Sequence, residues 1–250
     1  MKITMSDMCL QAYIARPPDC DTFFYFFTMK FDLRLSALLL ASHYFGAHSF
    51  KQMQVIRSLS QRNVMSASEI LKNPDWPAKW PFSPVDFTRE DQSNDGNFYY
   101  QPRLVYHIDE YAVDALTKYY STVFRPNSAI LDICSSWVSH YPPTSSFARA
   151  VGLGMNEQEL SQNRQLSEYV VQDLNKNTVF PFADNSFDYV TCVVSVDYLI
   201  HPLEVFTEIR RVLKPGGLAI FSQSNRCFPS KAIKIWLETN DFQVRFLTHL

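Results

Sequence analysis

The stretch from Phe187 to Ser222 limits the fold most strongly, because it reads as a strand, a helix and a second strand. Residues 187–196 are mostly apolar and rich in β-branched residues, as in a strand buried on both faces of a parallel sheet. Pro202 suits the first turn of a helix, where its missing N–H costs nothing. Apolar residues then recur at helical spacing at Leu203, Phe206, Ile209 and Leu213. Residues 218–221 form a second apolar run, so we predict a parallel strand pair with a right-handed crossover.

Two motifs in this region carry a resemblance to a known family. FPFADNSFDYV at residues 180–190 and LKPGG at 213–217 are similar to the second half of class I S-adenosylmethionine-dependent methyltransferases of the type 11 kind. The resemblance extends from Tyr119 to Trp236, about half of the chain. It implies an α/β fold of the Rossmann-like, doubly wound type, with a mostly parallel sheet and helices on both faces. It also implies S-adenosylmethionine as cofactor and methyl transfer to a small-molecule acceptor.

Composition narrows the classes of partner. The chain has 250 residues, 46% hydrophobic and 19% charged, with a formal net charge of -2, which suits a globular protein. Because no dense run of lysine or arginine occurs, a nucleic acid is not favoured as a partner. None of the five cysteines forms a CxxC pair, so no metal site is predicted. The six glycines are few for a protein that binds a nucleotide, because nucleotide-binding loops usually contain several.

The N-terminal region has the pattern of a targeting sequence. From Met29, basic residues precede a short apolar run and then small residues, which is the layout of a secretory signal peptide. The apolar run is too short to span a bilayer. Residues 47–50, AHSF, resemble the cleavage site of algal plastid presequences, and the segment that follows lacks acidic residues until Glu69. We therefore expect plastid targeting through a signal plus a transit peptide. An apolar helix of the mature fold, in a mitochondrial or cytoplasmic protein, is the alternative.

Three regions are expected along the chain. Residues 1–60 form the presequence region, residues 61–97 are a proline-rich irregular segment, and residues 98–250 form the methyltransferase-like domain. A helix is predicted over residues 107–124, with its apolar stripe packed on the sheet.

The expected cofactor site departs from the family at its first loop. Asp132, in the strand predicted over residues 128–134, matches the acidic residue that opens the family's glycine-rich loop. Cys134 and Ser136 stand where the family usually has two glycines, and neither can freely adopt a positive φ. Pro142 and Pro143 make the usual long helix after this loop improbable. We expect a remodelled loop that either binds the cofactor in an altered way or does not bind it.

The next two strands also carry expected contacts. Gly154, in the strand predicted over residues 149–156, aligns with the family's acidic residue for the ribose hydroxyls, and Asn156 offers a weaker neutral acceptor. Asp173, in the strand predicted over residues 169–174, matches the residue that commonly meets the adenine amino group; a turn cap is the alternative. The full predicted cofactor-binding set is Asp132, Cys134, Ser135, Ser136, Met155, Asn156, Asp173, Leu174 and Ser195.

Asp197 and Tyr198 follow the fourth predicted strand and are the candidate catalytic residues. Ligands of open α/β sheets bind at the carboxyl ends of the strands, which places both near the acceptor. Since methyl transfer depends mainly on alignment of the reacting atoms, their expected role is positional. The alternative for Asp197 is to cap the following turn.

The C-terminal region predicts a helix over residues 232–237 and a sixth strand over residues 242–247. The family normally closes with a β-hairpin, and the chain stops before its second strand. The strand at residues 218–221 would then expose an unpaired edge. This predicts a truncated isoform, an incomplete gene model, or a protein partner that covers the edge. It also keeps open a catalytically inactive, methyltransferase-like binding or assembly protein. A dehydrogenase is disfavoured because no GxGxxG motif follows the first strand.

Overall fold

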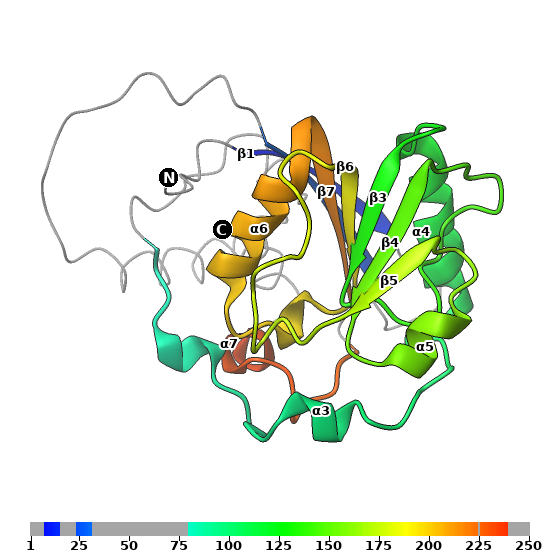
Figure 1. Ribbon diagram of the computed structural model, residues 1–250. Helices are drawn as coiled ribbons and strands as arrows, with labels where there is room; N and C mark the ends of the chain where they lie inside the picture. The colour runs from blue at the N-terminus through cyan, green and yellow to red at the C-terminus, as the bar shows by residue number, and fades with distance from the viewer. Residues whose placement is uncertain (1–7, 16–23, 32–79, 225, 240–250) are drawn as a thin grey trace, which may run out of the picture.

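A computed structural model describes residues 8–15, 24–31, 80–224 and 226–239 (Figure 1). Five of the strands are parallel and lie side by side, from β7 to the edge strand β5. They are β3 (Ala129–Ile133), β4 (Arg149–Gly154), β5 (Glu168–Val171), β6 (Phe187–Val193) and β7 (Leu213–Ser224). The predicted Rossmann-like α/β fold is therefore confirmed.

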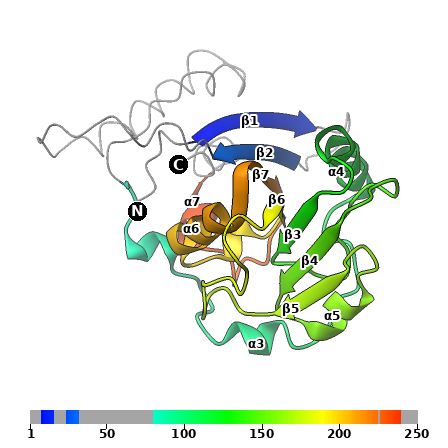
Figure 2. The ribbon, with the colours of Figure 1, turned by 45° about the horizontal axis from the view of Figure 1, so that its top comes forward.

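The strand order across the sheet is β1-β2-β7-β6-β3-β4-β5. The two N-terminal strands, β1 (Met8–Ala15) and β2 (Phe24–Phe31), form an antiparallel hairpin. β2 pairs with β7 in antiparallel register, from Phe24 opposite Ser224 to Lys30 opposite Leu218. Figure 2 shows the hairpin in blue beside the orange β7.

The expectation of an unpaired β7 edge is wrong, because β2 supplies the missing neighbour. A strand edge presents a row of backbone donors and acceptors, and pairing with β2 satisfies those on this side of β7. The signal in the sequence is the run FYFFTMKF at Phe24–Phe31, since aromatic residues favour strands. Both strands lie inside the region predicted as a presequence, and that assignment stays a prediction.

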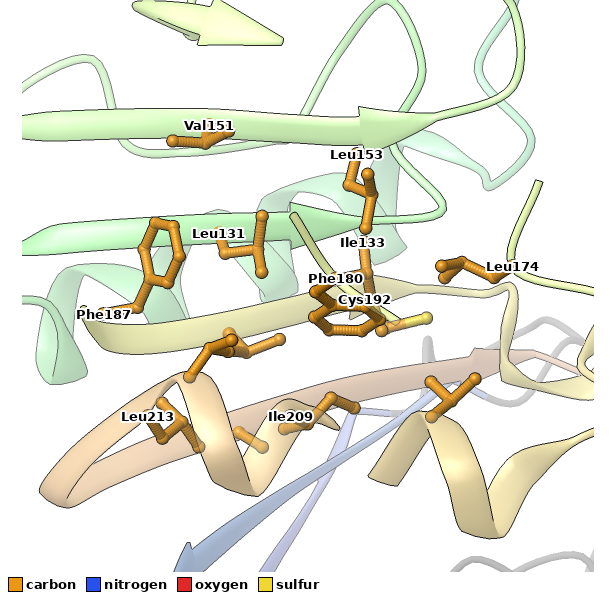
Figure 3. Close-up of a cluster of buried hydrophobic side chains, with 14 of the residues drawn as sticks. Leu131, Ile133, Val151, Leu153, Leu174, Phe180, Phe187, Cys192, Ile209 and Leu213 are labelled. Atoms are coloured by element: carbon orange, nitrogen blue, oxygen red, sulfur yellow. The ribbon is translucent and has the colours of Figure 1, made fainter. Parts of the chain in front are cut away.

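Helices cover the two faces of the sheet, as expected for a doubly wound fold (Figure 1). On one face, α4 (Glu110–Val123) packs its buried Leu116 and Tyr120 against strand residues such as Ile130. On the other face, α6 (Pro202–Val212) packs its buried Val205, Ile209 and Val212 against the alternate strand residues. Figure 3 shows this second core, with Leu131, Ile133, Val151 and Leu153 pointing from the strands toward Ile209 and Leu213.

Several element boundaries differ from the sequence predictions, and the local structure explains two of these differences. α4 begins at Glu110 rather than residue 107, because the Asp109 carboxylate accepts a hydrogen bond from the Ala112 amide and so caps the helix from outside. The KPGG segment forms an irregularity inside β7 rather than a turn before it. Leu213 pairs with Phe187 and Leu218 pairs with Tyr189, and Gly216 in between takes a φ of 78°.

A buried ion cluster fixes the segment that precedes α4. This segment contains η3 (Pro84–Phe87) and α3 (Asp95–Phe98), and Arg89 bridges to Ile233 just before α7 (Lys234–Glu238). Asp95 pairs with Arg89 at 2.8 Å and with Lys231 at 3.0 Å. Burial alone would raise the pKa of Asp95, but the bonds from Arg89, Asn175 and Lys231 outweigh it and leave this pKa below its usual value. The cluster therefore holds residues 89–99 against the C-terminal part of the domain.

Candidate cofactor-binding site

A cavity of about 330 Å³ lies at the carboxyl ends of the parallel strands. The segments after β3, β4, β5 and β6 form its floor, and residues 95–108 and 226–228 contribute the remaining wall. Loops at this end of an open α/β sheet are where ligands bind in such folds. The cavity is therefore the candidate functional site.

The structure brings together in this cavity the residues that the family resemblance and the strand ends predicted for the site. All nine members of the predicted cofactor-binding set line it: Asp132, Cys134, Ser135, Ser136, Met155, Asn156, Asp173, Leu174 and Ser195. Tyr198 also lines it, whereas Asp197 is not among the lining residues. The individual roles assigned to these residues stay predictions.

Asp132 organises the loop that follows β3. Its buried carboxylate accepts hydrogen bonds from Ser135 Oγ and Ser139 Oγ, each at 2.7 Å, and from Thr191 Oγ1 at 2.8 Å. Burial raises the pKa of Asp132 to about 6, and the three hydroxyls limit the rise. As expected from Pro142 and Pro143, no helix forms between β3 and β4. The hydroxyl contacts to Asp132 thus hold this loop in place of helical packing.

The backbone at two strand ends adopts the left-handed conformation. Cys134 has a φ of 52° after β3, and Val194 has a φ of 40° after β6. Non-glycine residues rarely take this conformation, and a β-branched residue such as valine does so under strain. Cys134 therefore keeps the backbone geometry that a glycine would adopt freely. Strained residues of this kind gather at functional sites, which agrees with the position of both at the cavity.

The same loop explains why Gly154 lacks a side chain. The Ser135 amide donates to the Leu153 carbonyl oxygen at 3.0 Å, which brings the loop onto the end of β4. A β-carbon at Gly154 would lie 2.1 Å from the Ser135 carbonyl oxygen, a backbone atom that cannot swing away. No carboxylate can therefore occupy the position at which the resemblance places the ribose-binding acid.

Asn156 acts as the N-cap of α5 (Glu157–Gln162). Its Oδ1 accepts from the Glu159 amide at 3.0 Å, and its Nδ2 donates to the carbonyl oxygens of Tyr99 and Tyr100. Both amide protons are therefore used within the fold, and the residue connects α5 to the segment before α4.

Asp173 presents an unused hydrogen-bond acceptor at the cavity. Its Oδ1 accepts from the Asn175 amide at 2.9 Å, while its buried Oδ2 takes no hydrogen bond from the described part of the chain. The nearest cation is Lys176 Nζ at 3.7 Å, beyond hydrogen-bond distance. A buried carboxylate oxygen without a donor is unfavourable unless a ligand supplies one. An amino group such as that of adenine fits this requirement.

The other wall contains residues that the sequence did not single out. The Arg103 guanidinium lies 4.6 Å from the ring centre of Phe98 and 5.4 Å from that of Phe228. The Arg103 amide donates to Glu159 Oε1 at 2.7 Å, and Ser136 Oγ donates to Glu159 Oε2 at 2.6 Å. These contacts join residues far apart in the chain, so no spacing in the sequence could reveal them.

The two candidate catalytic residues differ in their environment. Asp197 is 4% exposed, and burial raises its pKa to about 8, so its carboxyl group is protonated at neutral pH. The Tyr198 hydroxyl accepts a hydrogen bond from the Phe228 amide at 2.9 Å, and burial raises its pKa.

His107 also lines the cavity, and burial lowers its pKa, so the ring is neutral at pH 7 and can accept a proton.

Among the described residues, no three His, Cys, Asp or Glu side chains come together as ligands for a metal ion. No helix in the described ranges is long and apolar enough to cross a membrane.

Comparison with known proteins agrees with the geometry of the cavity. Residues 133–221 match the family model described as a methyltransferase domain. Demethylmenaquinone methyltransferase of Bacillus cereus (strain ATCC 10987 / NRS 248) is 32% identical over 111 residues, which are 41% of this chain and 47% of that protein. The protein of the same description from Bacillus anthracis (strain CDC 684 / NRRL 3495) gives the same identity and coverage. The chain thus spans about half the length of these curated relatives.

Two solved structures are also similar over part of the chain. The S-adenosylmethionine-dependent methyltransferase from Mesorhizobium loti has 19% identity and a TM-score of 0.35, and the match covers 44% of this chain and 53% of that one. The [4+2]-cyclase SpnF has 22% identity and a TM-score of 0.38, and the match covers 46% and 47% of the two chains.

The family match spans β6, α6 and most of β7, together with the cavity loops that follow β3, β4 and β5. The expected cofactor also fits the cavity at Asp173, whose buried Oδ2 takes no hydrogen bond within the described ranges. Residues 133–221 therefore match a methyltransferase domain, and S-adenosylmethionine is the cofactor that this family implies for the cavity.

Proposed function

We propose that this chain transfers a methyl group from S-adenosylmethionine to a small-molecule acceptor, using the cavity at the carboxyl ends of β3 to β6. The observation that carries the proposal is the buried Oδ2 of Asp173, which takes no hydrogen bond from any residue that the structure describes. It lies just after β5 and lines the cavity with Leu174, so an adenine ring beside Leu174 would direct its amino group at Asp173.

The cofactor supplies a methyl group on a positively charged sulfur, which passes to a nucleophilic atom of the acceptor. The protein contributes mainly by alignment, since the cavity walls hold two molecules in contact. Tyr99, Trp137 and Phe228 line the cavity with aromatic surface. A neutral His107 in the same wall can take the proton that the acceptor releases.

An aromatic acceptor suits this wall, because flat rings pack well against Tyr99, Trp137 and Phe228. The relatives from Bacillus are named for methyl transfer to demethylmenaquinone, and this supports the same class of acceptor for this chain. We therefore include a flat, quinone-type ring as acceptor in the proposal.

Replacing Asp173 by asparagine is expected to weaken binding of S-adenosylhomocysteine, the demethylated product, about tenfold or more. Asp173 offers one oxygen to the Asn175 amide and the other to the ligand. Whichever way the asparagine amide turns, one of these acceptors becomes a donor, and the charge is lost. A hydrogen bond to a charged group contributes roughly 1.5–3 kcal/mol, which is about tenfold or more in affinity. Isothermal titration of the full chain measures the change.

Asp184→Asn is the matched control, because Asp184 has an exposed side chain that pairs with Arg211 and does not line the cavity. Its affinity should stay within about twofold of the unaltered protein. Equal binding by Asp173→Asn would place the adenine elsewhere. Absence of binding by the unaltered protein would contradict the enzyme proposal and favour a methyltransferase-like binding protein without catalysis.

A further inference from the structure

We infer that Glu159, on α5, is the residue that recognises the two adjacent ribose hydroxyls of the ligand, in place of an acid at the end of β4. The inference rests on the proposed function and adds a specificity-determining residue to the same cavity. Glu159 lines that cavity, half-buried, three residues after the Asn156 cap of α5.

The end of β4 is closed to any side chain that could bind these hydroxyls. The Ser135 carbonyl oxygen lies 2.1 Å from the point where the β-carbon of residue 154 would be, and Leu160 Cδ2 lies 3.2 Å from the same point. Leu160 follows Glu159 directly, so α5 brings the Glu159 backbone close to Gly154. A carboxylate on this helix can therefore reach the region that a residue at 154 cannot.

Among the residues that the structure describes, four carboxylates line the cavity: Asp95, Asp132, Glu159 and Asp173. Asp95 forms ion pairs with Arg89 and Lys231. Asp132 accepts hydrogen bonds from three hydroxyl groups inside the fold. Asp173 follows β5 and is the acceptor assigned to adenine. Glu159 forms no ion pair with any residue that the structure describes, so its negative charge is available to a ligand.

Two hydrogen bonds orient the Glu159 carboxylate but leave part of its acceptor capacity free. Ser136 Oγ donates to Oε2 at 2.6 Å, and the Arg103 amide donates to Oε1 at 2.7 Å. A carboxylate has about four acceptor positions, so one position remains on each oxygen. Two free positions on adjacent oxygens match two adjacent hydroxyl donors. Because the carboxylate is already oriented, a ligand need not pay the entropy of ordering it.

The arrangement also accounts for Ser136, which stands where the family usually has a glycine. Its hydroxyl ties the loop after β3 to Glu159 across the cavity. The altered loop thus blocks residue 154 through the Ser135 carbonyl and orients Glu159 through the Ser136 hydroxyl. The altered path of this loop therefore explains both why residue 154 is not an acid and why Glu159 can take the role of that acid.

The test compares S-adenosylhomocysteine with its 2′-deoxy analogue, by isothermal titration into the full chain and the variant Glu159→Gln. Glutamine keeps the shape of the side chain, and the Ser136 hydroxyl can turn to accept from its amide. We expect the unaltered chain to bind the analogue about tenfold more weakly than S-adenosylhomocysteine. Glu159→Gln should bind S-adenosylhomocysteine about tenfold more weakly, and should discriminate less than threefold between the two ligands.

Glu157→Gln is the matched control, since Glu157 is an exposed residue on the same helix and does not line the cavity. It should bind both ligands like the unaltered chain. The inference is overturned if Glu159→Gln binds S-adenosylhomocysteine as tightly as the unaltered chain. It is also overturned if the variant weakens both ligands equally, because Glu159 would then only position the loop. Either result leaves the proposed function intact, whereas no binding by the unaltered chain removes the proposed function itself.

Discussion

Introducing aspartate at Gly154 is expected to destabilise the fold by about 3 kcal/mol or more, although it restores the acid that the family resemblance places there. The new β-carbon would lie 2.1 Å from the Ser135 carbonyl oxygen and 3.0 Å from its carbonyl carbon. The loop cannot retreat easily, because the Ser135 amide is bonded to Leu153 and its hydroxyl to Asp132. Overpacking a well-filled site costs typically 1–3 kcal/mol and sometimes more, and a buried carboxylate adds a desolvation cost.

Urea unfolding of Gly154→Asp, Gly154→Ala and Gly96→Ala measures this effect. Alanine at 154 introduces the collision alone and should lower the free energy of unfolding by about 1–3 kcal/mol. Gly96→Ala is the control, since a β-carbon there meets only the Asn94 side chain, at 3.2 Å, and a change below about 1 kcal/mol is expected. Unchanged stability of Gly154→Ala would show that the Ser135 carbonyl does not occupy this position. Tighter binding of S-adenosylhomocysteine by Gly154→Asp would contradict the replacement of that acid by Glu159.

Replacing Lys231 by methionine is expected to cost about 3–5 kcal/mol of stability, because it breaks a buried ion cluster without opening a large cavity. The Lys231 side chain is 0% exposed and pairs with Asp91 at 2.9 Å and Asp95 at 3.0 Å. It also donates to the Ser93 carbonyl oxygen at 3.0 Å. Removing one member of a buried pair leaves an uncompensated charge, and this loss accounts for the size of the effect.

Lys234→Met separates the buried charge from a general effect of losing a lysine. Lys234 is 43% exposed and lies 3.7 Å from Glu238, so its loss should cost no more than about 0.5 kcal/mol. Both variants are compared by urea denaturation at neutral pH. Because Asp95 and Tyr99 line the cavity, Lys231→Met should also bind S-adenosylhomocysteine more weakly. A Lys231→Met protein as stable as the Lys234→Met protein would contradict a structural role for the cluster.

The parts of the fold that depend on local pattern could be predicted from the sequence. The apolar runs at β3, β4, β6 and β7 and the helical spacing of α6 predicted the central sheet, because burial on both faces needs apolar residues at nearly every position. The nine predicted cofactor-binding residues came mainly from the family resemblance, and they meet in one cavity because the carboxyl ends of parallel strands lie at one edge of a sheet.

The features that depend on distant contacts could not be predicted in this way. The pairing of β2 with β7 joins Phe24 to Ser224, and no periodicity within either segment specifies a partner so far along the chain. The contact of Glu159 with Ser136 and the Arg103 amide depends on the path of the loop after β3. The segment before residue 98 was assigned to an irregular region, yet its Asp95 lines the cavity because Lys231 and Arg89 hold it there.

A crystal structure of the full chain grown with S-adenosylhomocysteine would locate both contacts at once. The account predicts the adenine amino group at hydrogen-bond distance from Asp173 Oδ2, about 3 Å, and the ribose hydroxyls at the same distance from the Glu159 carboxylate. The Ser135 carbonyl should still cover Gly154. An adenine ring away from the end of β5, or no bound ligand at saturating concentration, would contradict the assignment of this cavity to S-adenosylmethionine.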